Sequence, residues 1–133
     1  MDMIPVADLR KIARARLRDA EVLLGARRYD GAVYLCGYAI EVALKARICR
    51  TLKWKEYPST KAEFQGYGSF RTHDLDALLH LSGREAAIKP KYLAEWSTVA
   101  VWDPNTRYQA IGTASAGDAR DIVQSVKTLL GAL

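Results

Sequence analysis

Residues 32–52 read AVYLCGYAIEVALKARICRTL, and this stretch carries the clearest helical pattern in the chain. Apolar side chains recur in it at steps of three and four residues, the period of one face of an α-helix. The first set is Ala32, Leu35, Ala39, Val42, Ala46 and Cys49, and a second set on another face is Ile40, Leu44, Ile48 and Leu52. A helix that is apolar on two faces is usually the central helix of a bundle. We therefore expect a central helix between the Asp30-Gly31 turn and Lys53-Trp54.

The segment before this helix has the same period on one face. Pro5 suits the first turn of a helix, where its missing N–H costs nothing. Apolar residues then recur on one face until Gly25 ends the pattern, at Leu9, Ala13, Leu17, Ala20 and Leu24. This segment is predicted to be a long amphipathic helix.

The second half of the chain predicts shorter elements. Glu56 to Phe70 has no clear period and is expected to be a loop. Short helical patterns follow: one with Thr72 as N-cap that ends at Ser82-Gly83, one opened by Pro90 and broken at Asp103-Pro104-Asn105, and one after the capping box of Ser115 and Asp118. Sustained apolar–polar alternation is absent from the sequence. The prediction is an all-α, up-and-down antiparallel bundle of four to five helices.

Composition places the chain among globular intracellular proteins. Its 133 residues, half hydrophobic and about a quarter charged, suit one domain spanning residues 1–133. The sequence contains no recognisable signal peptide and no apolar run long enough to cross a membrane. Cys36 and Cys49 fall on one predicted helix about 20 Å apart, too far for a disulfide, and neither has zinc-ligand neighbours. We expect a cytoplasmic protein with no metal, cofactor or membrane partner.

Positive charge is unevenly distributed along the chain, whose net charge is +5. One cluster runs from Lys45 to Lys61 and contains a single acidic residue before its last lysine, Glu56. The predicted first helix and its end add Arg10, Lys11, Arg14, Arg16, Arg18, Arg27 and Arg28. These cations are either a solvated face with charges favoured at a helix C-terminus, or a surface for the phosphates of nucleotides or RNA.

Four residues of the predicted central helix form a polar and aromatic stripe on an otherwise apolar element. Tyr34, Tyr38, Glu41 and Lys45 follow one another at spacings of four, three and four residues, so they share one face. Glu41 four residues before Lys45 is the favoured orientation for a helical ion pair. A carboxylate buried there requires partners from elsewhere in the chain.

The run from Arg28 to Ala46, RYDGAVYLCGYAIEVALKA, resembles the central helix of HEPN domains. The His73-Asp74-Leu75 start of the third predicted helix, the Trp102 to Arg107-Tyr108 corner and the Asp19-Ala20-Glu21 segment also resemble that family. The resemblance covers roughly Leu9 to Leu130. It implies a small helical bundle, generally dimeric and often paired with a minimal nucleotidyltransferase in toxin–antitoxin-like modules.

Many HEPN proteins are metal-independent ribonucleases that carry an arginine followed, after four to six intervening residues, by a histidine. This sequence has only two histidines, His73 and His80. The positions that would hold the arginine are Gly66, Tyr67 and Gly68 for His73, and His73, Asp74 and Leu75 for His80. The ribonuclease motif is therefore absent, and no residue is assigned a catalytic role.

The remaining site candidates lie in two short segments. His73, with Arg71 and Asp74 beside it, either binds an anion or orients a partner group, or it caps a helix together with Thr72. Arg107, followed by Tyr108, either pairs with Glu41 or presents its fork to a phosphate. The candidate binding groove thus contains Tyr34, Tyr38, Glu41, Lys45, Arg71, His73, Asp74, Arg107 and Tyr108, and we expect a cluster of Glu41, Lys45 and Arg107 at its centre.

Three functions remain open at this point. The favoured one is a non-enzymatic nucleotide- or RNA-binding interaction protein that forms a homodimer and works with a nucleotidyltransferase-type partner. The second is a ribonuclease toxin with a degenerate site that uses His73 and Arg107. The third is a purely structural dimerisation bundle. The homodimer is expected because Trp54, Trp96 and Trp102 lie near predicted loops and would expose an apolar patch.

Overall fold

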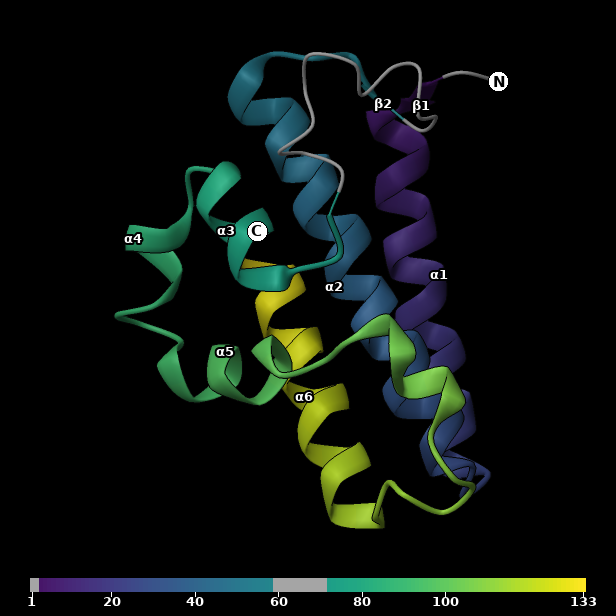
Figure 1. The fold of residues 1–133 in the computed structure, drawn as a ribbon. Helices are drawn as coiled ribbons and strands as arrows, with labels where there is room; N and C mark the ends of the chain where they lie inside the picture. Colours follow the sequence, from purple (N-terminus) through teal and green to yellow (C-terminus); the bar gives the residue numbers. More distant parts are fainter. Residues whose placement is uncertain (1–2, 59–71) are drawn as a thin grey trace.

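The computed structural model describes residues 3–58 and 72–133, and this part of the chain is an all-α bundle with one small sheet (Figure 1). It contains six α-helices, two short strands and one 3-10 helix, η2. In chain order they are β1 (Met3–Pro5), α1 (Val6–Gly25), α2 (Tyr29–Leu52), β2 (Glu56–Pro58), α3 (Leu75–Leu81), α4 (Glu85–Ile88), α5 (Leu93–Ala100), η2 (Pro104–Tyr108) and α6 (Ala116–Ala132). The predicted all-α bundle is confirmed.

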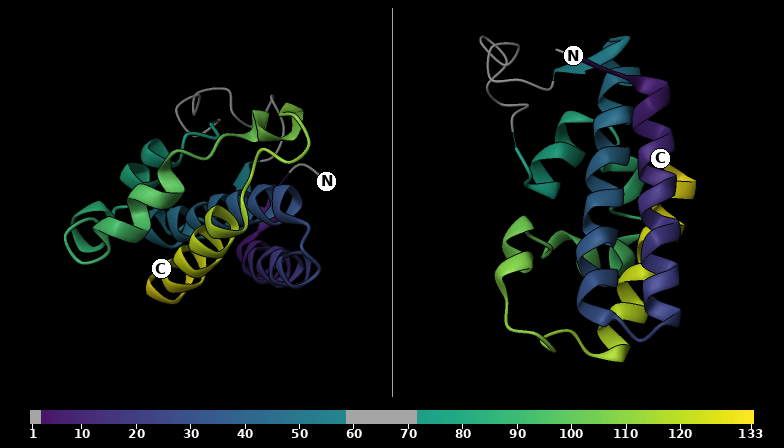
Figure 2. Two further views of the ribbon diagram at one scale, coloured as in Figure 1. Left: turned by 90° about the horizontal axis from the view of Figure 1, so that it is seen from below. Right: turned by 90° about the vertical axis from the view of Figure 1, so that its right-hand side faces the viewer.

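Helix α2 is the central element, as its two apolar faces predict. It packs against α1, α3 and α6 and also contacts η2 (Figure 2). Ile40, Leu44 and Ile48 are completely buried, and both cysteines are free and buried. The helix begins at Tyr29, so the expected Asp30-Gly31 turn is already its first turn. It ends where Lys53 adopts the left-handed conformation, with φ of 58°, and closes the last turn.

The small sheet was not predicted from the sequence. β1 and β2 pair antiparallel, with Ile4 opposite Tyr57, and thereby join the start of α1 to the end of α2. Pro5 is the last residue of β1 and precedes the helix that it was expected to open. Strands of three residues are too short to display apolar–polar alternation, which explains the omission. The rest of the predicted 56–70 loop, from residue 59 on, lies outside the described residues.

The third helix is capped differently from the prediction. Asp74, not Thr72, is the N-cap, because its carboxylate accepts a hydrogen bond from the backbone N–H of Ala77. The Thr72 hydroxyl accepts from the N–H of Asp74 and so supports the capping residue. The end at Ser82 and Gly83 is as expected, and Gly83 has a φ of 73°.

Between α3 and α6 the chain is more broken than its pattern indicated. The four-residue helix α4 precedes Pro90, and α5 begins only at Leu93. The segment after Asp103 forms η2, with the Asp103 carboxylate accepting from the N–H of Asn105. The predicted capping box of Ser115 and Asp118 is present at the start of α6, which packs on α1, α2 and α5. None of the described helices is long and apolar enough to cross a membrane.

Candidate functional site

Glu41 is the buried polar centre of α2. Only 3% of its surface is exposed, and its two carboxylate oxygens have different partners. The Lys45 ammonium donates to Oε2 at 3.2 Å, and Nδ1 of His73 lies 2.7 Å from Oε1. An ionised carboxylate only accepts hydrogen bonds, so the His73 tautomer that fits carries its proton on Nδ1. His73 ties the segment before α3 to the middle of α2.

Arg107 does not complete this cluster, which corrects the expected grouping of Glu41, Lys45 and Arg107. Helix η2 places its guanidinium beside the Tyr34 phenol of α2, and its central carbon lies 4.8 Å from the centre of the Tyr108 ring. His73 already occupies the oxygen of Glu41 that Lys45 leaves open. The long-range partner of the buried carboxylate is therefore His73, and not Arg107 as expected.

Electrostatic coupling links the two tyrosines of the stripe to Arg107. Tyr34 has a lowered pKa, chiefly because Tyr38 hydrogen-bonds it, with a further contribution from Arg107. The pKa of Tyr38 is raised to about 12, chiefly by burial and then by Tyr34. The pKa of Arg107 is raised by its bonds to Tyr108 and Tyr34. The guanidinium thus stays charged and is held in place by phenol groups.

Three aromatic rings, those of Tyr34, Tyr38 and Trp102, pack against one another beside Arg107. The rings of Tyr34 and Tyr38 meet edge to face at 5.1 Å between centres, and Tyr38 meets Trp102 in the same way at 5.1 Å. Gly37 allows this packing, because a Cβ atom on it would lie 1.8 Å from the Trp102 ring. Gly37 was not among the residues predicted from the sequence. The signal was a glycine in the middle of an otherwise strong helix, which usually has a packing or functional reason.

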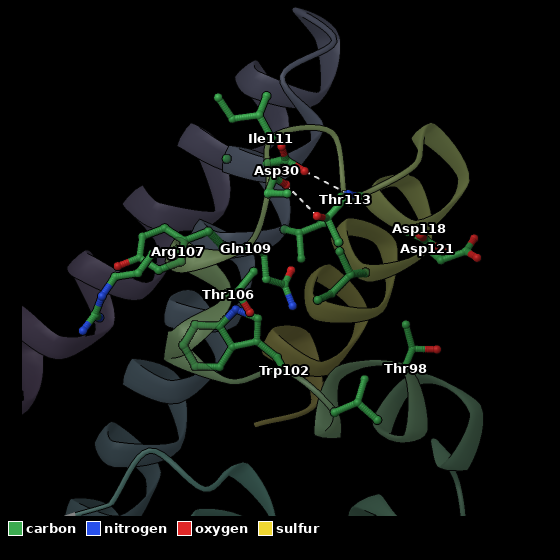
Figure 3. A pocket seen from close by; sticks show the side chains of 17 residues that line it. Asp30, Thr98, Trp102, Thr106, Arg107, Gln109, Ile111, Thr113, Asp118 and Asp121 are labelled. Carbon is green, nitrogen blue, oxygen red and sulfur yellow. Dashed lines mark hydrogen bonds between the residues drawn. The ribbon is translucent and has the colours of Figure 1, made fainter.

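Two cavities open on either side of Trp102 and Arg107, which line both. The first, of about 560 Å³, lies between the start of α2, η2 and the start of α6 (Figure 3). Its other lining residues include Asp30, Tyr34, Gln109 and Asp121. The second, of about 620 Å³, is lined by His73, Asp74, Asp76, Asp103 and neighbouring residues. Arg107 is therefore positioned to reach a molecule in either cavity.

The loop beside the first cavity is fixed by Asp30. Its carboxylate accepts hydrogen bonds from the N–H of Gly112 at 2.6 Å and of Ala114 at 2.9 Å (Figure 3). These bonds hold the pKa of Asp30 below its usual value, with Gly112 contributing most. Asp118 is likewise engaged in the capping box of α6. Three carboxylates line each cavity, and two in each accept a backbone N–H: Asp30 and Asp118 in the first, Asp74 and Asp103 in the second.

The predicted groove residues are brought together only in part. Tyr34 and Arg107 line the first cavity, and His73, Asp74 and Arg107 line the second. Tyr38, Glu41 and Lys45 line neither cavity. Tyr38 packs against Trp102, and Lys45 binds Glu41, which in turn contacts His73. Tyr108, next to Arg107 in the chain, is 75% exposed. Arg71 lies outside the described residues. Within the described ranges, the structure contains no group of three or more metal-ligating side chains.

Comparison with known families agrees with this architecture. The model of the HEPN domain family matches residues 6–133, nearly the whole chain. The chain belongs to the HEPN family. No curated protein and no solved structure matches it significantly. Membership indicates a function related to nucleotides or RNA, and HEPN domains often dimerise.

Proposed function

We propose that this HEPN protein binds a nucleotide, free or at the end of an RNA, in the first cavity. The observation that carries the proposal is the position of Arg107. Arg107 lines the cavity, and its guanidinium lies at the cavity's outer edge beside the phenol groups of Tyr34 and Tyr108. No ion pair with a carboxylate occupies it in residues 3–58 and 72–133. A positioned guanidinium fork suits bidentate recognition of phosphate.

The surroundings of Arg107 suit the remainder of a nucleotide. The exposed Tyr108 ring offers a face on which a base can stack, and base–aromatic stacking contributes about 1–3 kcal/mol per base. Tyr34, Trp102 and Gln109 supply an aromatic wall and an amide for polar contacts. The volume of about 560 Å³ lies within the usual range of small-molecule sites.

We also propose an oligomeric state, a protein partner and a cellular location for this protein. We infer a cytoplasmic homodimer of one domain, residues 1–133, acting with a minimal nucleotidyltransferase in a toxin–antitoxin-like module. The prediction that Trp96 and Trp102 are exposed at the dimer interface is wrong, because both side chains are buried. The exposed apolar residues near the first cavity are instead Val101 and Ile111, which suit an interface beside it. Sedimentation velocity at tens of micromolar tests the dimer, and a clean monomer would contradict it.

The binding experiment compares Arg107→Gln with a control that removes an exposed arginine elsewhere, Arg120→Gln. Thermal shift with nucleoside mono-, di- and triphosphates identifies a ligand, and calorimetry then measures its Kd. We expect Arg107→Gln to weaken binding at least about tenfold, through loss of a charge-assisted hydrogen bond, and to change stability by less than about 0.5 kcal/mol. Binding that is equal in both variants would contradict the proposal.

One observation favours a second function, a ribonuclease with a degenerate site. His73 and Arg107, far apart in the sequence, line the second cavity together. His73 is 58% exposed on its side chain, although Nδ1 lies against Glu41. We nevertheless expect no RNA cleavage above background, because the family's arginine–histidine motif is absent from the sequence. Cleavage of a mixed RNA ladder that disappears in His73→Ala would establish the second function instead.

A further inference from the structure

A third cavity, of about 430 Å³, lies at the opposite end of α2 from the nucleotide cavity. On α2, Tyr34 lines the nucleotide cavity and Arg47 lines the third cavity. These two residues are 13 positions apart, which is about 20 Å along the helix axis. Its lining residues come from α1, the second half of α2 and the end of α6. Its lining residues are Arg10, Ala13, Arg14, Leu17, Ala43, Ala46, Arg47, Arg50, Leu130, Gly131 and Leu133. The proposed nucleotide site does not include any of them.

Four arginines and no acidic residue line this cavity. Arg10 and Arg14 come from successive turns of α1, and Arg47 and Arg50 come from successive turns of α2. Within the described residues, none of the four forms an ion pair with a carboxylate. The described residues therefore place four positively charged side chains around this cavity, with no acidic side chain among them.

The position of Arg47 distinguishes this cluster from an ordinary solvated face. Its Nε atom is buried and has no hydrogen-bond partner among residues 3–58 and 72–133, as is also true of the Nε atom of nearby Arg84. The pKa of Arg47 is lowered, first by burial and then by the positive charges of Arg50, Arg84 and Arg10. A buried donor without a partner is costly, and so is the mutual repulsion of cations. An anion in the cavity would offset both costs.

The floor of the cavity is apolar, which limits the kind of anion. Alanines 13, 43 and 46 leave space between α1 and α2, and Leu17 and Leu130 complete the floor. Small-molecule sites are mostly apolar with a few charged groups, and their usual volume of about 300–1,000 Å³ includes this one. A bare inorganic ion would leave the apolar floor uncovered. The lining therefore fits an anionic head joined to an apolar body.

We propose that this cavity binds a small organic phosphate, with the phosphoryl group held by Arg47 and Arg50 and flanked by Arg10 and Arg14. The guanidinium fork pairs bidentately with phosphate oxygens, and several forks around one group neutralise its double charge. The organic part of the ligand lies against the alanine floor. This second site is independent of Arg107, so the protein has capacity for two phosphate-bearing ligands.

The test uses phenyl phosphate and inorganic phosphate as probes, with binding measured by calorimetry on the full chain. Three variants are compared: the pocket variant Arg47→Gln/Arg50→Gln, the charge-matched control Arg18→Gln/Arg120→Gln, and Arg107→Gln. We expect phenyl phosphate to bind more tightly than inorganic phosphate because its ring covers the apolar floor. The pocket variant is expected to weaken phenyl phosphate binding at least about tenfold. The control and Arg107→Gln are expected to change it less than about twofold.

The outcomes separate this site from the proposed nucleotide site. Loss of binding in Arg107→Gln but not in the pocket variant would overturn this inference and leave the nucleotide proposal standing. An equal loss in the control would show non-specific charge attraction and overturn it as well. Binding of a short single-stranded RNA, but of neither small probe, would replace the small-molecule site with an RNA surface. If the pocket variant does not fold, Arg50→Gln alone, on an exposed side chain, gives the same comparison.

Discussion

The middle and the C-terminal end of α2 both carry charged side chains, but in opposite surroundings: Glu41 is buried, whereas Arg47 is half-buried and Arg50 is exposed. Glu41 in the middle is almost completely buried, and both of its oxygens have a cationic or hydrogen-bonding partner. Arg47 and Arg50, two turns further on, face other arginines, and the Nε atom of Arg47 is buried without a partner.

The difference separates a structural charge from a functional one. A buried charge whose partners are supplied by the fold fixes the arrangement of those elements. A set of like charges that the described residues leave without partners is instead stabilised when an anion from solution binds to it. Arg107 lies between these cases, since phenol groups hold it in place without neutralising it.

The largest expected effect comes from removing the partners of Glu41. The double variant Lys45→Met/His73→Ala leaves its carboxylate buried and unpaired, and should lower the free energy of unfolding by about 3–5 kcal/mol. Urea denaturation measures the loss. Adding Glu41→Leu to the double variant should recover much of it, because no buried charge then remains. A double variant as stable as the wild type would show that water, not the fold, satisfies Glu41.

The next effect concerns the packing that supports the paired region. Gly37→Ala would place a methyl group against the buried Trp102 ring and should cost about 2 kcal/mol, as overpacking typically does. The cost should be much smaller in a Trp102→Leu background, where space is available, and a double-mutant cycle by urea denaturation gives the coupling. An unchanged cost in that background would mean that the clash is not with Trp102.

A smaller effect of opposite sign is expected at the unpaired end. Arg47→Leu removes a charge with a buried, unpartnered Nε and should raise the free energy of unfolding by about 1 kcal/mol in the absence of ligand. Its exposed counterpart on α1, Arg18→Leu, should stay within about 0.5 kcal/mol. Added salt should stabilise the wild type more than Arg47→Leu, because salt screens the repulsion of the arginines. Destabilisation by Arg47→Leu would indicate that the fold already neutralises it.

The smallest expected effect is a change in acid sensitivity at Asp30. Its pKa is lower in the folded protein than its ordinary value of 3.8, so its stabilising contribution is complete above that value and disappears as the pH falls through the folded pKa. Asp30→Asn should therefore flatten the decline of Tm below about pH 4. Asp121→Asn, at the same cavity, is the control. An unchanged acid limb in Asp30→Asn would show that the hydrogen bonds to Gly112 and Ala114 do not persist in solution.

Much of the helical architecture follows from the sequence alone. The two apolar faces of α2, the single apolar face of α1 and the capping box of Ser115 and Asp118 are local patterns, and the structure has all three. The positions of Glu41 and Lys45 one turn apart are equally local. Periods of three and four residues and cap residues report directly on backbone geometry, so they can be read without knowledge of the tertiary structure.

The partners of these residues were decided only by the tertiary structure. Glu41 needed a partner from elsewhere in the chain; Arg107 was expected from the sequence, and the structure supplies His73 instead. The three-residue strands, the stack of Trp102 on Gly37 and the convergence of arginines from α1 and α2 also join segments distant in sequence. Such contacts depend on how the helices pack, and no periodic signal in one segment records which side chain of another segment will face it.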